Sequence, residues 1–187
     1  MWGRGSAKPL KLCTFSRVMK EKGIEDAVKA VRTINEAAGS IIYTLNIYGQ
    51  VDENYKEKFQ KLTLDFPNYI SYGGCVPFGE SREVLKNYYA LVFPTYYEGE
   101  GFAGTLIDAL AAGVPVVASD WKYNAEIVME NIIGCTYDYK DNQKLIDILL
   151  KISKGTAMWN NMKQQCVQQA ERYTPSVVVG NYIKKLK

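Results

Sequence analysis

The feature that most constrains the fold is an alternation of short apolar runs with amphipathic helical patterns over most of the 187 residues. The expected strands are rich in Val and Ile, and they cover residues 11–16, 41–48, 69–72, 90–94, 115–119 and 132–137. The expected helices cover residues 24–37, 53–64, 81–89, 104–112, 143–152, 158–172 and 176–186. Short strands that are apolar on both faces belong in parallel sheets covered by helices. The pattern therefore predicts an α/β fold, a Rossmann-like parallel sheet with helices on both faces.

One domain accounts for nearly the whole chain. Residues 1–10 open with a Gly-rich, basic stretch without periodicity, which predicts a linker or arm, and residues 11–187 hold the predicted domain. Local signals mark two helix ends: Ser81 begins a pattern like a capping box, and Gly113 stands where a helix should stop. The apolar fraction of 47% is ordinary for a globular protein and excludes a disordered chain.

Composition excludes several kinds of chemistry. Histidine is absent, so this chain cannot hold a Ser-His-Asp triad, a Cys-His pair or a His-ligated metal. The formal net charge of +3 is too small to indicate a nucleic-acid surface, and we expect no nucleic-acid partner. Cys13, Cys75, Cys135 and Cys166 form no C-x-x-C pair, which favours reduced thiols in the cytosol. No signal peptide or membrane span is visible, so we expect a cytoplasmic protein, with peripheral contact at the inner face of the membrane left open.

The carboxyl ends of parallel strands are where ligands bind, beside the amino ends of helices. One such place is the segment 94–105, in which an apolar strand leads through an acidic, Gly-rich turn into a helix. The backbone around this helix start can bind an anion such as a diphosphate, whereas Glu98 and Glu100 would repel a bare phosphate. A nucleotide sugar suits both the anion-binding helix start and the two carboxylates, with its diphosphate at the N–H groups and its sugar hydroxyls at the carboxylates. The alternative is an ordinary strand–turn–helix with a solvated acidic loop.

Two basic residues and one acidic residue complete the candidate site. Arg17 and Lys22 follow the first strand, where an arginine fork and a lysine can hold phosphate oxygens and stabilise a diphosphate leaving group. Asp108 follows Glu100 with E-x7-D spacing, and its carboxylate can accept hydrogen bonds from a ribose diol. The alternatives are a solvated basic loop for Arg17 and Lys22, and a favourable interaction with the helix dipole for Asp108.

An ordered set of motifs then resembles the carboxyl-terminal half of GT-B family 4 retaining glycosyltransferases. The resemblance runs from about Lys11 to Leu186 and rests on the order of the set rather than on single fragments. Its parts are the segments 16–23, 47–49, 70–76 (ISYGGCV), 93–95 with 100–102, 109–119 (ALAAGVPVVAS) and 125–128. It implies the carboxyl-terminal domain of a GT-B fold.

The resemblance also implies roles for individual residues. Arg17 and Lys22 match the basic pair at the donor diphosphate, and Glu100 matches the acidic residue that contacts the donor sugar; these three form the implied catalytic set. Asp108 matches the ribose-binding position, where members usually have Glu. The remaining implied donor-binding residues lie at the base and at the phosphates: Gly73, Gly74, Cys75, Val76, Gly101, Phe102, Ala103, Gly104 and Thr105. Neither a cofactor nor a metal ion is expected.

The activity implied is transfer of a hexose, with retention, from a nucleoside diphosphate sugar to a glycan or lipid-linked acceptor. UDP is favoured over GDP, and the setting is capsule, exopolysaccharide or lipopolysaccharide synthesis. Family enzymes have an amino-terminal acceptor domain that this sequence does not show, so we expect an incomplete, inactive half that needs that domain or a separate subunit. Without that cover, the segment 177–183 is expected to expose an apolar patch.

Two other functions remain open from the sequence. A non-catalytic module that binds a nucleotide or a partner could keep the same fold, and the effect of Asp108→Ala on nucleotide affinity distinguishes this hypothesis. Another GT-B-type enzyme, such as an epimerase or a phosphorylase, is less favoured. An epimerase usually has histidine in this region, and no site for a phosphorylase's cofactor lysine is visible.

Overall fold

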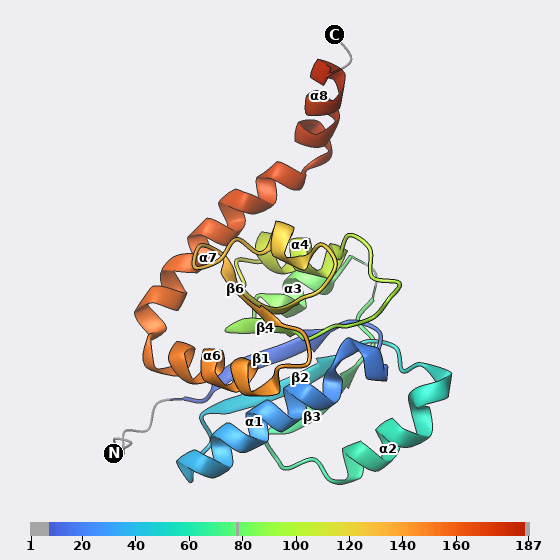
Figure 1. Cartoon of the computed structure of the whole chain (residues 1–187), viewed down its shortest axis with the longest axis vertical. Helices are drawn as coiled ribbons and strands as arrows, with labels where there is room; N and C mark the ends of the chain where they lie inside the picture. The colour runs from blue at the N-terminus through green and yellow to red at the C-terminus, as the bar shows by residue number, and fades with distance from the viewer. Residues whose placement is uncertain (1–7, 78, 186–187) are drawn as a thin grey trace.

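The structure, a computed structural model, describes residues 8–77 and 79–185 (Figure 1). Its centre is a six-stranded sheet in the order β3-β2-β1-β4-β5-β6, and every neighbouring pair is parallel. The strands are β1 (Leu10–Phe15), β2 (Tyr43–Tyr48), β3 (Ile70–Gly74), β4 (Ala90–Phe93), β5 (Val116–Asp120) and β6 (Gly134–Asp138). The strand order reverses between β1 and β4, which makes their carboxyl ends the topological switch point of a Rossmann-like sheet.

Helices cover both faces of the sheet, as predicted. They are α1 (Ile24–Ala38), α2 (Lys56–Leu64), α3 (Ser81–Leu85), α4 (Gly104–Ala111), α5 (Asn124–Ile127), α6 (Asn142–Lys154), α7 (Thr156–Ala170) and α8 (Pro175–Lys185). The 3₁₀ turns η1 (Lys20–Lys22), η2 (Glu53–Tyr55) and η3 (Glu171–Tyr173) directly precede α1, α2 and α8, respectively. Alternate residues of each central strand supply the two hydrophobic clusters on the two sides of the sheet.

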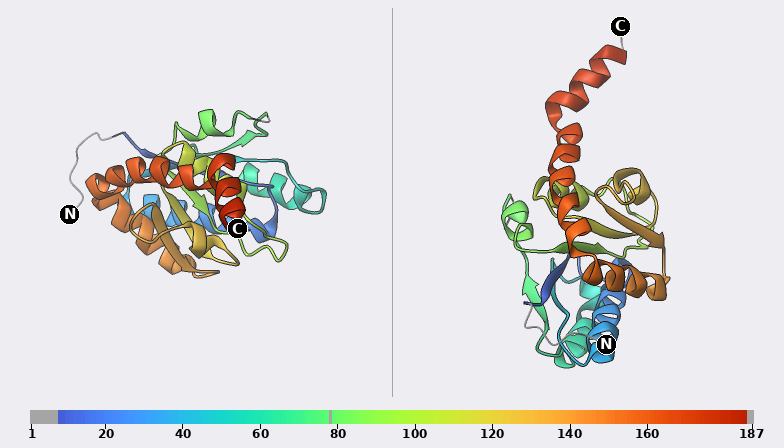
Figure 2. Two further views of the ribbon diagram at one scale, coloured as in Figure 1. Left: turned by 90° about the horizontal axis from the view of Figure 1, so that it is seen from above. Right: turned by 90° about the vertical axis from the view of Figure 1, so that its left-hand side faces the viewer.

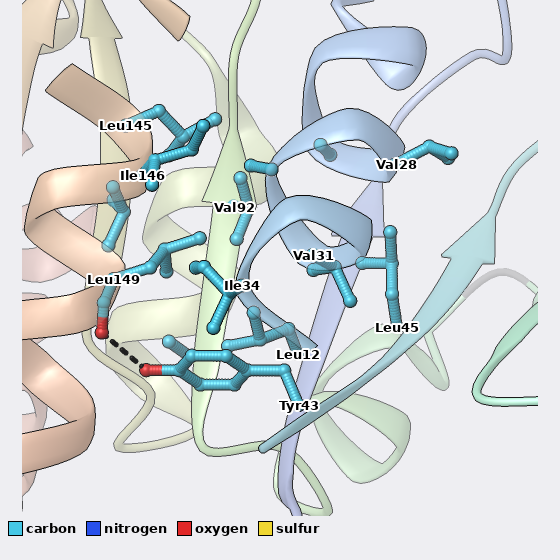
Figure 3. Packing of buried hydrophobic residues seen from close by; sticks show 14 of the residues in the cluster. Leu12, Val28, Val31, Ile34, Tyr43, Leu45, Val92, Leu145, Ile146 and Leu149 are labelled. Atoms are coloured by element: carbon cyan, nitrogen blue, oxygen red, sulfur yellow. Dashed lines mark hydrogen bonds between the residues drawn. The ribbon is translucent and has the colours of Figure 1, made fainter. Parts of the chain in front are cut away.

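The first cluster lies under α1 and α6. Leu12 of β1 and Val92 of β4 pack there against Val31 and Ile34 of α1 (Figure 3). Tyr43 is fully buried in this cluster, and its hydroxyl donates a hydrogen bond of 2.7 Å to the backbone carbonyl of Leu149. A buried phenol needs such a partner, so this bond fixes α6 against the start of β2.

The second cluster lies under α3, α4 and α5. Cys13 of β1 and Leu91 of β4, the sequence neighbours of Leu12 and Val92, point to this side and pack with Leu106 and Leu110 of α4. Helix α7 belongs to both clusters, because Trp159 near its start is buried in the first and Cys166 near its end in the second. The central strands β1, β4 and β5 are therefore largely buried on both faces, which makes the loops at their ends the places to look for a functional site.

The structure corrects several local predictions. Ser81 does not cap α3: the N-cap is Glu80, and the Ser81 hydroxyl instead donates a hydrogen bond to Asp108. Helix α3 is also shorter than the predicted 81–89, and the four-residue helix α5 was not predicted. The expected linker at 1–10 loses Leu10 to β1, while residues 1–7 lie outside the described residues.

Helix α8 continues from the end of α7 and extends away from the sheet (Figure 2). Val178, Val179, Tyr182 and Ile183 of α8 have exposed fractions of 51%, 54%, 65% and 49%. These residues form the apolar patch expected at this end of the chain. None of the helices in the described ranges has the length and apolar character needed to span a bilayer.

Candidate functional site

A cavity of about 350 Å³ opens at the switch point between the carboxyl ends of β1 and β4. We call it the β1–β4 cavity. Three segments line it: the loop after β1, the loop after β4 and the amino end of α4. Its lining residues are Ser16, Arg17, Met19, Lys22, Phe93, Tyr97, Glu100, Phe102, Ala103, Gly104 and Thr105. The structure therefore brings together the predicted residues Arg17, Lys22 and Glu100 with the start of α4.

Backbone contacts fix the two loops against each other. The N–H of Tyr96 donates a hydrogen bond of 2.7 Å to the carbonyl of Glu21. Gly23 has φ of 67°, and a Cβ at this position would lie 2.2 Å from the carbonyl oxygen of Pro94. Only glycine allows the turn after η1 both this dihedral angle and this close approach. Lys22 is thereby held directly beside the end of β4.

Lys22 and Glu100 form an ion pair inside the cavity. Lys22 Nζ lies 2.5 Å from Glu100 Oε2, and the two side chains are only 11% and 10% exposed. The hydroxyl of Thr95 donates to the same carboxylate oxygen at 2.7 Å, and Lys22 Nζ lies 4.9 Å from the centre of the Tyr97 ring. An ammonium has three donors and a carboxylate has two acceptor oxygens, so each group keeps hydrogen-bonding capacity for a ligand.

The amino end of α4 adds a second cationic feature. Its N-cap is Ala103, which offers no side-chain acceptor, and the first turn of the helix contains no acidic residue. The N–H groups of a first helical turn lack intrahelical acceptors and carry partial positive charge. Ala103, Gly104 and Thr105 line the cavity. This geometry suits an anion with several oxygens, such as a diphosphate.

Arg17 lies at the rim of the cavity. Its side chain is 62% exposed, and its Nη1 is 3.7 Å from Asp52 Oδ2. An exposed ion pair at this distance is weak. The guanidinium is therefore free to turn toward an anion held by Lys22.

The predicted nucleoside-binding residues do not line this cavity. The Asp108 carboxylate accepts a hydrogen bond of 2.7 Å from Ser81 Oγ and lies 3.4 Å from Arg82 Nε, so it ties α4 to the start of α3. Gly73, Gly74, Cys75 and Val76 lie at the end of β3 and in the loop that follows it, where Cys75 is exposed. Cys75 and Val76 lie in the connection from β3 to α3.

Sequence reasoning missed the positioning role of Thr95. This residue is 1% exposed, and its hydroxyl holds Glu100 in place. Its only sequence signal is a threonine directly after an apolar strand at the predicted ligand-binding edge. Met19, Phe93 and Tyr97 also line the cavity without having been assigned a role.

No group of three or more His, Cys, Asp or Glu residues within 8–77 and 79–185 is arranged to hold a metal ion. The positive groups that the described residues place at the cavity are Arg17, Lys22 and the start of α4.

Comparison with known proteins decides the family. The family described as Glycosyl transferases group 1 matches residues 4–173. The chain belongs to the group 1 glycosyltransferases. The matched region contains all three segments that line the β1–β4 cavity.

The chain is also similar to a curated glycosyltransferase in sequence and to two solved structures in fold. The amylovoran biosynthesis glycosyltransferase AmsK of Erwinia amylovora is 29% identical over 154 residues, 80% of this chain and 37% of AmsK. Anabaena HepE, solved with UDP and glucose, superimposes with a TM-score of 0.80 at 18% identity, over 97% of this chain and 49% of HepE. The GtfA/B complex superimposes with a TM-score of 0.77 at 21% identity, over 98% of this chain and 36% of that one. The chain thus spans between about a third and a half of the length of these relatives.

Proposed function

We propose that this chain is the donor-binding domain of a retaining family 4 glycosyltransferase. The complete enzyme moves a hexose from a UDP-sugar to a glycan or lipid-linked acceptor. The observation that carries this proposal is the β1–β4 cavity, in which Lys22, Glu100 and the start of α4 converge at the switch point of the sheet. A cation and helix N–H groups suit a diphosphate, and a neighbouring carboxylate suits the hydroxyls of the attached sugar.

We assign each group a part in the transfer from its position in the cavity. When the bond between the anomeric carbon and the diphosphate oxygen breaks, negative charge collects on the departing diphosphate. The acceptor oxygen bonds to the same carbon, and its proton passes to the departing diphosphate oxygen. Lys22 and the first N–H groups of α4 stabilise that charge in place, and Arg17 joins them from the rim. Glu100, held by Thr95, orients the sugar through its hydroxyls. These groups supply the positive charge without a metal ion.

We assign the nucleoside to the surface between the cavity and β3. From the diphosphate at α4, the ribose extends toward Asp108, and the base toward Gly73, Gly74, Cys75 and Val76. Gly101 and Phe102 lie in the loop before α4 and flank the diphosphate. HepE, a structural relative solved with UDP and glucose, supports UDP over GDP.

The remaining machinery lies in another domain or subunit. Two observations support this: the chain spans 36% of the chain it matches in the GtfA/B complex, and the α8 residues Val178, Tyr182 and Ile183 are exposed. Several exposed apolar residues on one helix are typical of a surface that another part of the protein covers.

AmsK, named for amylovoran biosynthesis, supports a role in capsule, exopolysaccharide or lipopolysaccharide synthesis. Four free cysteines favour a cytoplasmic location.

Calorimetric titration of the chain with UDP and with GDP tests the proposal. We expect UDP to bind more tightly than GDP, with an affinity that excess EDTA leaves unchanged. The double variant Arg17→Ala/Lys22→Ala should lose about 100-fold or more in UDP affinity, because two charge-assisted contacts disappear. Lys20→Ala is the matched control, since Lys20 belongs to the same loop but does not line the β1–β4 cavity. The proposal is wrong if the wild type does not bind UDP or if the double variant binds it equally well.

Glu100→Gln tests the contact with the sugar. The amide keeps a hydrogen bond with Thr95 but accepts more weakly from hydroxyls than a carboxylate does, by about 1 kcal/mol. We expect the UDP-glucose affinity to fall about fivefold relative to that of UDP. UDP affinity itself should hold or rise, because a negative charge near the diphosphate is removed. A parallel loss for both ligands would contradict a role for Glu100 at the sugar.

Cys75 reports on the proposed base site. It is exposed, whereas Cys13, Cys135 and Cys166 are buried, and burial raises the pKa of Cys135 to about 11 and that of Cys166 to about 12. A thiol reagent at pH 8 should therefore modify Cys75 at once and the other three only on unfolding. UDP should slow the modification of Cys75 if the base covers it. An unchanged rate under saturating UDP would place the base elsewhere.

A further inference from the structure

A second and larger cleft lies beside the β1–β4 cavity. It measures about 770 Å³, and its lining comes from η1, the loops after β2, β4, β5 and β6, and the start of α2. We call it the aromatic cleft. Met19 and Tyr97 line both cavities. A ligand in the aromatic cleft would therefore lie next to whatever occupies the β1–β4 cavity, separated by these two side chains.

Five aromatic residues line the aromatic cleft: Tyr55, Tyr96, Tyr97, Trp121 and Tyr139. The Trp121 and Tyr139 rings lie against each other, with their centres 4.6 Å apart. The Trp121 indole N–H donates a hydrogen bond of 2.7 Å to the backbone carbonyl of Tyr97, which fixes the indole. Tyr139 is 44% exposed. The result is a preorganised aromatic surface that is partly open to solvent.

The same dipeptide pattern follows two neighbouring strands. Trp121-Lys122 follows β5 and Tyr139-Lys140 follows β6. In both, the lysine has positive φ, 52° at Lys122 and 65° at Lys140. Lysine rarely adopts this conformation, which costs about 1–3 kcal/mol and is concentrated at functional sites.

The strained lysines bring their ammonium groups onto the aromatic rings. Lys122 Nζ lies 5.1 Å from the centre of the Trp121 ring. Lys140 Nζ lies 4.8 Å from the Tyr96 ring and 5.4 Å from the Tyr139 ring. Such contacts hold the rings in place and leave hydrogen-bond donors at the edge of the aromatic surface.

The aromatic cleft is lined by equal numbers of basic and acidic side chains. They are contributed by three basic and three acidic residues: Lys20, Lys58, Lys140, Glu21, Asp52 and Glu98. Several of these have partners, for example Glu98 with Lys122 at 2.9 Å and Lys58 with Glu25 at 2.7 Å. A phosphate-rich ligand would require an excess of cations. The balance favours a neutral ligand that has many hydroxyl groups and one apolar face.

We propose that the aromatic cleft binds a neutral saccharide, the end of the acceptor glycan, with a sugar ring stacked on Trp121 and Tyr139. The C–H face of a pyranose packs on aromatic rings, while paired carboxylates and ammonium groups at the rim exchange hydrogen bonds with its hydroxyls. The acceptor assignment rests on the proposed function. Contact between the two cavities at Met19 and Tyr97 supports it, since an acceptor hydroxyl must approach the donor sugar. The chain then contributes to acceptor binding and not only to donor binding.

Saturation-transfer NMR on the 187-residue chain tests this proposal. The probes are the methyl glycosides of glucose, galactose, mannose and N-acetylglucosamine, with cellobiose, maltose and lactose. We expect at least one probe to receive saturation, most strongly at the ring protons of one face, and to keep this signal with excess UDP. Trp121→Ala should weaken the signal by about tenfold. Tyr123→Ala is the matched control, because Tyr123 is a 53% exposed aromatic residue after β5 that does not line the cleft.

Three results would overturn the proposal: no signal with any probe, an unchanged signal in Trp121→Ala, or displacement of the glycosides by UDP. Tyr139→Ala provides a second variant if Trp121→Ala does not fold. UDP affinity measured on the same samples separates this proposal from the donor site. Glycoside binding without UDP binding would contradict the donor assignment alone, and UDP binding without glycoside binding would contradict the aromatic cleft alone.

Discussion

Lys22→Met is expected to weaken UDP binding by about 10- to 100-fold, because a charged donor at the diphosphate contributes roughly 1.5–3 kcal/mol. The same change should destabilise the free protein. Glu100, whose side chain is only 10% exposed, would lose the ammonium that lies 2.5 Å away. Leaving a largely buried charge unpaired costs about 3 kcal/mol or more, equivalent to a melting temperature lower by about 6–12 °C in a domain of this size.

The double variant Lys22→Met/Glu100→Gln separates the two effects. Removing both charges should restore most of the stability, because no unpaired charge remains, while UDP binding stays weak. Lys20→Met provides the control for each measurement, since Lys20 is exposed and outside the β1–β4 cavity. Thermal unfolding and UDP titration of the four proteins give the complete comparison. If Lys22→Met retained wild-type UDP affinity, Lys22 would not contact the diphosphate.

Gly23→Ala is expected to lower the free energy of unfolding by at least about 3 kcal/mol and to abolish UDP binding with it. Alanine pays a backbone penalty of roughly 1–2 kcal/mol at the φ of 67°, and its methyl group would also lie 2.2 Å from the Pro94 carbonyl oxygen. The end of β4 and the loop after β1 would have to separate. That movement would carry Lys22 away from Glu100, which is why stability and ligand binding should fall together.

Gly39→Ala isolates the backbone penalty. Gly39 has a nearly identical φ of 62°, but no atom lies within 4 Å of the position a Cβ would take. We expect a loss of only about 1 kcal/mol in chemical denaturation and no change in UDP affinity. Equal losses in the two variants would show that the contact between Gly23 and Pro94 does not hold the loops together.

Much of the fold could be predicted from the sequence because the strands are apolar on both faces. Residues such as Leu12 and Cys13 are neighbours that point into opposite clusters, and only a sheet covered on both sides buries both of them. The short helices were harder to predict from the sequence. Helix α3 ends at Leu85 rather than near residue 89, and Ser81 bonds to Asp108 rather than capping the helix. The hydrogen-bond partner of Ser81 lies 27 positions away in the sequence, so the residues around Ser81 could not predict it.

The sequence predicted that Arg17, Lys22, Glu100 and the start of α4 would lie together, as they do in the β1–β4 cavity, but it did not predict the contacts among them. Lys22 and Glu100 were each expected to face the donor, yet their ion pair joins residues 78 positions apart and depends on the packing of Gly23 against β4. Asp108 was expected at the ribose, which stays a prediction; in the structure its contacts with Ser81 and Arg82 join α4 to α3. The sequence did not predict the aromatic cleft as a site, because its rings come from loops after different strands.

A crystal structure of the chain with UDP is the decisive test of the proposed donor site. We expect the diphosphate in the β1–β4 cavity, with phosphate oxygens within hydrogen-bonding distance of Lys22 Nζ and of the first N–H groups of α4, and the uracil beside Cys75. Diphosphate density in the aromatic cleft, or at any site that contacts neither Lys22 nor the start of α4, would contradict it.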